Sequence, residues 1–122
     1  MTRAALVFAM GLPLMGQSSN VRVFDASLEA TWSGAVAVAQ GAFLADRISN
    51  EGRRLRLRTG PLRAYTFDVV VQEESGGKTR VELVLRTNSA IAAVRKDALR
   101  NAERYFGLLR DRLTSWGRRD PR

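Results

Sequence analysis

The chain contains no cysteine and no histidine among its 122 residues. Without cysteine it can form no disulfide, no thiolate metal site and no lipid anchor on a cysteine, and it has no thiol nucleophile. Without histidine it lacks the commonest metal ligand, the usual general base and the side chain that titrates near neutral pH. We therefore expect neither a metal nor a cofactor, and we expect that the protein is not an enzyme.

The sequence also lacks motifs for catalysis. Gly76-Gly77 is typical of a hairpin turn and not of a phosphate-binding loop, because no strand-to-helix phosphate motif surrounds it. The carboxylates are scattered, with no spacing that would guarantee a paired acid and base. They include Asp25, Asp46, Glu51, Asp68, Glu73 and Glu74. These absences favour a non-catalytic role.

The composition is that of an ordinary folded domain. Hydrophobic residues make up 45% of the chain and charged residues 26%, which argues against wholesale disorder. A chain of this length has room for one domain with one modest core. We assign that single domain to residues 21–116, where the periodic patterns lie.

The first twenty residues have the pattern of a cleavable secretory signal. Arg3 supplies a positive start, and residues 4–16 form an uncharged, mostly apolar run, shorter than the roughly 20 apolar residues that span a bilayer. Cleavage near Ser18 would place Gly16 and Ser18 at the two positions that must be small. We predict that residues 1–20 are a signal peptide and that the protein is exported, either periplasmic or secreted. The alternatives are a hydrophobic segment packed on the domain and a permanent anchor.

The first part of the domain predicts a strand over residues 21–25 and then a helix. Ser27 is a good N-cap, and the helix should run to about residue 40, where Gly41 ends it. Apolar residues recur at helical spacing, so that one face can pack against a sheet. These residues are Leu28, Trp32, Ala35, Val36, Ala39 and Phe43.

Four strands should follow, joined as two hairpins. Turn signals lie at residues 49–52 and 75–77, and apolar residues alternate with polar ones on either side of them. Alternation with one apolar and one polar face is typical of an antiparallel sheet that is covered on one side. The expected strands cover residues 43–48, 53–59, 64–74 and 78–87.

The last segment predicts a long amphipathic helix. Asn88 or Ser89 would cap it, Gly117 would end it, and a basic polar tail would occupy residues 117–122. The apolar stripe should pack on the sheet, although a coiled-coil partner would also fit it. The stripe consists of Ile91, Val94, Ala98, Ala102, Tyr105, Leu109, Leu113 and Trp116. The opposite face carries Arg95, Lys96, Arg100, Glu103, Arg104, Arg110 and Arg112. The fold class is therefore α+β, with two helices packed on one face of an antiparallel sheet in the order β-α-β-β-β-β-α.

Residues 21–116 resemble small helix-grip proteins of the bacterial envelope. The stretch Val23-Phe24-Asp25-Ala26-Ser27, followed by Glu29 and Trp32, a helix, a glycine and a strand-turn-strand, is similar to the opening of these proteins. They include short uncharacterised lipoproteins and domains of the C component of the outer-membrane barrel assembly machinery. The same pattern fits the wider helix-grip group of lipid and small-ligand carriers. Ser18 and Ser19 stand where a lipoprotein would need its lipidated cysteine, and the resemblance transfers no functional residues.

The net charge of +8 points to an anionic partner, because a basic surface attracts anions over long range. Five arginines should lie on the polar face of the sheet and could bind phosphates or carboxylates. They are Arg54, Arg56, Arg58, Arg80 and Arg86. Asp68 and Glu82 should share that face, and no aromatic residue interleaves with the arginines, which disfavours nucleic acid. The alternatives are a solvated face, an acidic protein, or an anionic envelope surface such as phospholipid or lipopolysaccharide.

Two hypotheses therefore stand for the function. The first is a non-catalytic envelope module that docks a protein or an anionic membrane surface, which predicts a filled core. The second is a carrier that holds an apolar ligand or lipid between the sheet and the last helix, which predicts a cavity. Its lining would include Trp32, Tyr65, Phe67, Tyr105 and Phe106. The short sheet and the few core aromatics favour the first.

Overall fold

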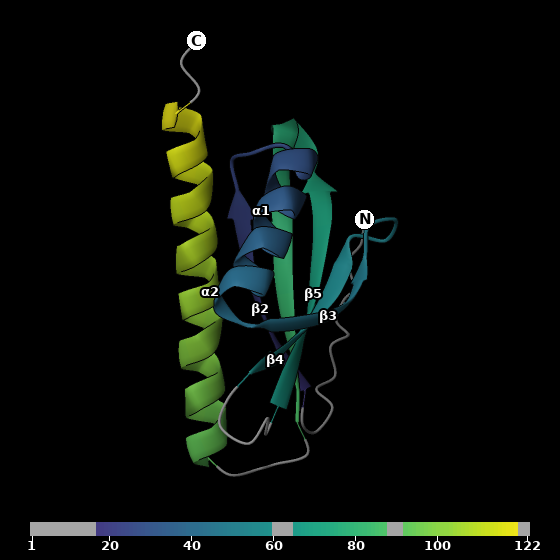
Figure 1. Ribbon diagram of the computed structural model, residues 1–122. Helices are drawn as coiled ribbons and strands as arrows, with labels where there is room; N and C mark the ends of the chain where they lie inside the picture. The colour runs from purple at the N-terminus through teal and green to yellow at the C-terminus, as the bar shows by residue number, and fades with distance from the viewer. Residues whose placement is uncertain (1–16, 60–64, 88–91, 120–122) are drawn as a thin grey trace.

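The computed structural model describes residues 17–59, 65–87 and 92–119. Within them the chain forms five strands and two long helices, with a short 3₁₀ turn between the last two strands (Figure 1). The elements are β2 (Gln17–Phe24), α1 (Leu28–Ala42), β3 (Leu44–Ser49), β4 (Arg54–Thr59), β5 (Tyr65–Glu74), β6 (Lys78–Arg86) and α2 (Ala92–Arg119). The predicted α+β class and the predicted order of elements are confirmed.

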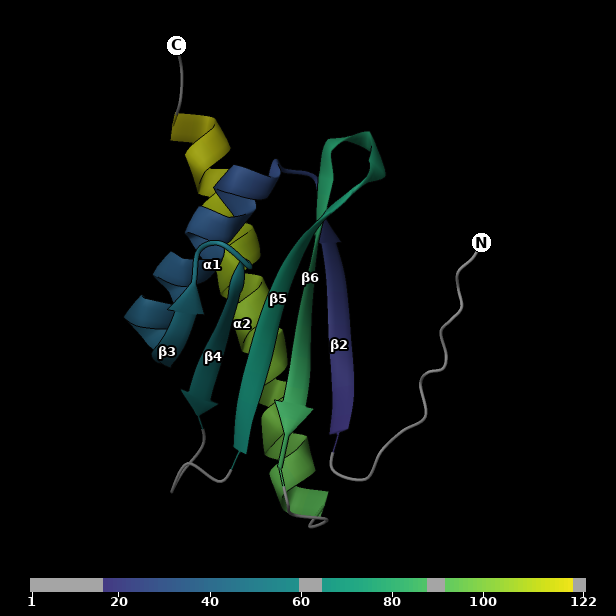
Figure 2. The same cartoon turned by 90° about the vertical axis from the view of Figure 1, so that its right-hand side faces the viewer.

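The strands form one antiparallel sheet in the order β2-β6-β5-β4-β3. Three successive hairpin-like connections build β3 to β6, and the first strand of the chain returns to pair with the last. Both helices lie on the same side of the sheet, and α2 runs along its whole length (Figure 2). Neither of the two described helices covers the other side of the sheet, here called the outer face.

Apolar and polar side chains alternate along the strands, so one face of the sheet is apolar and the other is polar. Leu55 and Leu57 of β4 are buried against the helices, whereas the intervening Arg56 belongs to the outer face. Apolar residues from both helices and from three strands join in one core. Its fully buried members include Tyr105, Phe67, Leu57, Leu83, Leu109, Val69 and Val81. A single core of this kind is what one covered antiparallel sheet requires.

Local signals position the elements around this core. The Ser27 hydroxyl accepts a hydrogen bond from the backbone N–H of Ala30 at 3.1 Å, which caps α1 as predicted. Gly76 and Gly77 adopt φ of 75° and 76°, so the hairpin turn needs residues without a Cβ. At Gly34 a Cβ would lie 3.1 Å from a methyl group of Leu109. Gly34 therefore allows α1 to approach α2 closely.

Several strand ends differ by one residue from the prediction, and three boundaries were wrong by two residues or more. The first strand begins at Gln17 and not at residue 21, because residues 17–20 pair in register with the end of β6 although their side chains are polar. Helix α1 continues through Gly41 to Ala42, where nothing crowds the glycine. Helix α2 continues through Gly117 to Arg119, so the basic tail expected from residue 117 begins inside the helix. Residues 1–16, the proposed caps Asn88 and Ser89, Ile91, and the Trp116 side chain lie outside what the structure describes.

Candidate binding surfaces

The five aromatic residues expected to line a ligand groove form part of the hydrophobic core. Their exposed fractions are all 7% or less. Tyr105 contacts Phe43 and Phe106 with ring centroids 5.7 and 6.3 Å apart, and Tyr65 meets Phe67 edge-on at 5.7 Å. Tilted and edge-on ring pairs are favourable, and the ring surface in such a contact is not available to a ligand. Trp32, Tyr65, Phe67, Tyr105 and Phe106 are thus already in contact with protein atoms.

The polar atoms of two of these side chains are also satisfied within the chain. The Tyr105 hydroxyl donates to the carbonyl of Ala35 at 2.9 Å, which ties α2 to α1. Burial raises the pKa of Tyr105 well above its usual value. The Trp32 indole N–H donates to Asn50 Oδ1 at 3.0 Å. Both groups therefore stabilise the fold in this conformation.

Tyr65 belongs to a polar cluster at the beginning of β5. Its hydroxyl donates to Asp97 Oδ2 at 2.5 Å and accepts from the Asn101 amide at 2.6 Å, so the sheet is joined to α2. Arg100 pairs with the other oxygen of Asp97 at 3.3 Å. Burial, together with the neighbouring Asp97, raises the pKa of Tyr65 to about 12. The cluster places a neutral hydroxyl and a carboxylate beside the apolar core.

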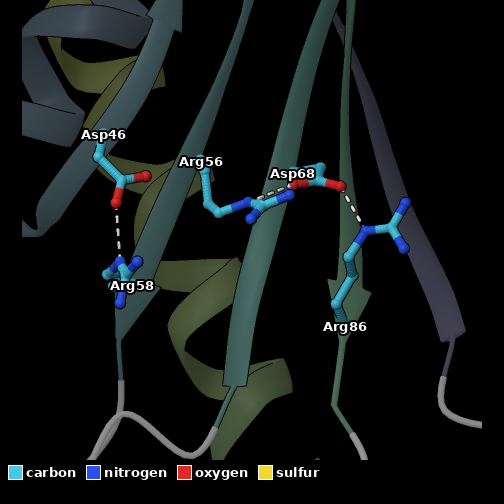
Figure 3. A network of polar contacts seen from close by, with 5 residues as sticks. All are labelled: Asp46, Arg56, Arg58, Asp68 and Arg86. Atoms are coloured by element: carbon cyan, nitrogen blue, oxygen red, sulfur yellow. Dashed lines mark hydrogen bonds and ion pairs between the residues drawn. The ribbon is translucent and has the colours of Figure 1, made fainter.

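The outer face of the sheet holds the predicted arginines, and it pairs them with carboxylates. Figure 3 shows Asp68 of β5 between Arg56 of β4 and Arg86 of β6. Arg56 Nε donates to Asp68 Oδ1 at 3.0 Å, and Arg86 Nε donates to Asp68 Oδ2. Burial alone would raise the pKa of Asp68, but the two guanidinium groups outweigh it and lower that pKa below its usual value. In the same figure Arg58 donates to Asp46 of β3 at 2.8 Å.

Arg80 is also engaged on this face. It donates to Gln72 Oε1 at 3.0 Å and lies 3.7 Å from Glu82 and 3.9 Å from Glu74. Among the described residues, only Arg54 of the five predicted arginines makes no ion pair or hydrogen bond through its side chain. Four of the five therefore already contact carboxylates of the chain itself. The co-location predicted from the sequence is correct, but the face is a cross-strand salt-bridge network.

Most of the excess positive charge is on α2. Residues 92–119 contain eight basic and three acidic residues, a net charge of +5 out of +8 for the chain. Lys96, Arg100 and Arg104 are spaced four residues apart and are all exposed, so they form one line along the solvent side of the helix, here called the cation row. Arg104 also stacks over the ring of Phe43 at 4.9 Å. The sequence placed these residues on the polar side of the helix.

A groove of about 540 Å³ lies between β2 and α2. Phe24 and Phe106 contribute apolar surface to it, while Arg22 pairs with Glu103 across it at 2.9 Å. Arg22 also stacks on Phe106 at 4.9 Å. A groove between the sheet and the last helix was predicted, but of its five predicted lining residues only Phe106 lines this one.

The described ranges contain neither a cluster of metal ligands nor a membrane-spanning helix. No group of three or more histidine, cysteine, aspartate or glutamate residues there could hold a metal ion. The helices of residues 17–59 and 92–119 include none that combines the length and apolar character needed to cross a bilayer.

The chain matches no protein-family model and no curated protein. Its structure is similar to that of a protein from Nitrosospira multiformis, with a TM-score of 0.64 and 17% identity, over 84% of this chain and 99% of that one. Ara h 8.0201 matches with a TM-score of 0.56 and 9% identity over 81% of this chain and 97% of its own. The di-domain ARO/CYC protein BexL of the BE-7585A biosynthetic pathway matches with a TM-score of 0.56 and 11% identity, over 80% of this chain and 46% of that chain.

Identities this low show the fold alone. The chain has a helix-grip-like fold, in which a curved antiparallel sheet holds a long terminal helix. The predicted helix-grip pattern is therefore confirmed. The narrower resemblance to envelope lipoproteins and to the barrel assembly component stays a prediction.

Proposed function

We propose that this helix-grip protein is a non-catalytic interaction module that binds an anionic surface of the cell envelope through the cation row of α2. The observation that carries the proposal is the division of charge between the two arginine-rich regions. The outer face of the sheet has neutralised four of its five arginines, whereas α2 retains a net charge of +5. A charged surface attracts an anion only with the charge that its own partners leave uncompensated.

An anion at the outer face would have to compete with built-in carboxylates. Asp68 accepts from two guanidinium groups at once and its side chain is only 24% exposed. At the cation row the side chains extend into solvent, and the Arg100 side chain is 74% exposed. Binding there would compete with one ion pair, that of Arg100 with Asp97 at 3.3 Å, and with the stacking of Arg104 on Phe43.

The expected strength follows from the general scale for basic residues near an anionic membrane. Each contributes about 1 kcal/mol. Three together amount to about 3 kcal/mol, or on the order of 100-fold in partitioning. The attraction should fall with added salt, because exposed charges are screened beyond a Debye length.

The test is vesicle flotation of the purified chain. We expect it to float with vesicles of phosphatidylglycerol in phosphatidylcholine and to remain behind with phosphatidylcholine alone. The variant Lys96→Ala/Arg100→Ala/Arg104→Ala should lose most of this binding while its circular dichroism spectrum stays unchanged. Equal binding by the variant would contradict the proposal, and so would failure of the wild type to bind the anionic vesicles. If the wild type instead binds an acidic envelope protein and not the vesicles, the partner of the cation row is a protein.

Export is part of this proposal and is supported by the pattern of residues 1–20. The intact mass of the protein recovered from the envelope fraction of its own cells measures it directly. Loss of about eighteen residues would agree with cleavage near Ser18. Recovery of the full-length chain from the cytosol would argue against an envelope role.

A carrier of an apolar ligand is the second candidate, and the polar cluster around Tyr65 favours it. A neutral hydroxyl and a carboxylate beside an apolar core could orient the polar end of such a ligand. The five core aromatics would then have to separate to admit it. Native mass spectrometry of the protein purified from its own cells would reveal a bound small molecule, and Tyr65→Phe should weaken its retention. Nucleic-acid binding through the sheet receives less support, because the arginines concerned are paired.

A further inference from the structure

The two edges of the sheet differ in how they are protected. Edge strand β3 has six residues, a break in register between Asp46 and Ser49, and a positive φ of 52° at Arg47. Bulges and charges of this kind prevent another strand from adding to an edge. Edge strand β2 has eight residues in unbroken register with β6, and Arg22 is its only charged residue. Within the described ranges, β2 pairs with β6 alone, so its second edge is free (Figure 2).

Exposed apolar side chains gather at this free edge. Four large hydrophobic residues of the described chain are exposed, and two of them, Val21 and Val23, belong to β2. Val21 and Val23 are 36% and 52% exposed and face outward, opposite Glu82 and Arg80 of β6. A long regular edge flanked by apolar residues is a template for pairing with another strand.

The sequence of β2 is complementary to itself in one antiparallel register. In a two-fold pair that continues the sheet, outward residues must oppose outward residues. Centring the pair on Val21 sets Val21 against its counterpart, Val23 against Ser19, and Arg22 against Asn20. Centring it on Arg22 would oppose two like charges, which is unfavourable. Centring it on Asn20 would oppose both valines to polar residues.

We propose that two copies of this chain associate through their β2 edges, antiparallel and centred on Val21, to form one continuous sheet. The main-chain groups of the free edge supply the hydrogen bonds, and the paired valines bury the apolar surface. Because the two-fold axis is perpendicular to the sheet, both α2 helices lie on the same side of the joined sheet. This proposal is independent of what the cation row binds.

The absence of cysteine makes a cross-linking test specific, since an introduced thiol is the only one in the chain. Directly opposed residues of an antiparallel pair have Cβ atoms about 4.5–5.5 Å apart, close enough for a disulfide after a small adjustment. Val21→Cys should therefore give a disulfide-linked dimer under mild oxidation. Leu44→Cys is the matched control, because Leu44 is 53% exposed on the other edge strand. It should remain monomeric under the same conditions.

Sedimentation equilibrium provides a second readout that does not depend on oxidation. The wild-type chain should be a dimer, and Val21→Lys/Val23→Lys should be a folded monomer by circular dichroism, because each lysine would face a lysine or lie beside one. A wild-type monomer would overturn the proposal. Equal cross-linking of Val21→Cys and Leu44→Cys would also overturn it, since that pattern indicates random collision. A dimer that survives the two lysines would place the interface elsewhere.

Discussion

The outer face of the sheet and the solvent side of α2 are both rich in arginine, but they use it differently. On the sheet, β4, β5 and β6 bring Arg56, Asp68 and Arg86 side by side, so that each guanidinium has a carboxylate (Figure 3). On α2, three cations follow one another at four-residue spacing with a single carboxylate, Asp97, in contact. The comparison teaches that the number of basic residues on a face does not measure its capacity to bind an anion. That capacity depends on how many carboxylates the fold places beside the basic residues.

The largest expected effect on stability comes from the centre of the sheet network. Asp68→Ala would leave Arg56 and Arg86 next to each other without a carboxylate, and we expect it to lower the free energy of unfolding by about 2 kcal/mol. Glu73→Ala is the control, because Glu73 is exposed on the same strand and makes no ion pair among the described residues. It should change the stability by less than about 0.5 kcal/mol. Urea unfolding measures both, and equal effects would show that the network is not structural.

The Tyr65 cluster joins β5 to α2 on the helix-covered side of the sheet, and its removal should have the next largest effect on stability. Tyr65→Phe eliminates the hydrogen bonds to Asp97 and Asn101, and we expect a loss of about 1–2 kcal/mol at neutral pH. The raised pKa of Tyr65, about 12 against 10, means that the unfolded chain ionises first as the pH rises. Wild type should therefore lose stability relative to Tyr65→Phe between pH 10 and 12. A constant difference over that interval would contradict the assignment.

A smaller effect should appear in acid. The pKa of Asp68 is lowered in the folded state, so its ionised form stabilises the protein above the unfolded pKa of 3.8. As the pH falls through the folded pKa, this contribution disappears. The stability difference between wild type and Asp68→Asn should be constant from pH 5 to 8 and should shrink below about pH 4. A difference that persists undiminished in acid would indicate that folding does not lower the pKa of Asp68.

The smallest effect on stability is expected at the cation row. Lys96→Ala/Arg100→Ala/Arg104→Ala should change the free energy of unfolding by less than about 1 kcal/mol, because exposed charges contribute little and alanine favours a helix. Added salt should likewise weaken vesicle binding far more than it changes the urea midpoint. A large destabilisation of this variant would show that the row, like the sheet arginines, serves the fold.

Much of the fold could be predicted because the signals are local. Alternation in β4, β5 and β6, the N-cap Ser27 and the glycine turn are each visible within a few residues. The beginning of β2 could not be predicted, since residues 17–20 are polar and become a strand only by pairing with β6. The end of α2 was missed because Gly117 lowers helix propensity without preventing a helix that is already formed.

The positions of the candidate surfaces could be predicted from the sequence, but the pairing of their arginines with carboxylates could not. Period-two alternation places Arg54, Arg56 and Arg58 on one face, and the structure confirms it. Their neutralisation depends on which residues the register sets opposite them, and Asp68 lies twelve residues from Arg56 in the chain. Only the cation row is visible from spacing alone, because its three members are neighbours on a single helix.

In the function proposed here, α2 and not the outer face of the sheet supplies the charge that binds an anion. The direct measurement is vesicle flotation of two variants with the same change in net charge. One is Lys96→Glu/Arg100→Glu/Arg104→Glu, and the other is Arg47→Glu/Arg54→Glu/Lys78→Glu, whose three positions are exposed on the sheet and make no ion pair among the described residues. We predict that the helix variant no longer floats with phosphatidylglycerol vesicles and that the sheet variant retains most of its binding. Equal losses, or a greater loss by the sheet variant, would show that α2 is not the anion-binding surface.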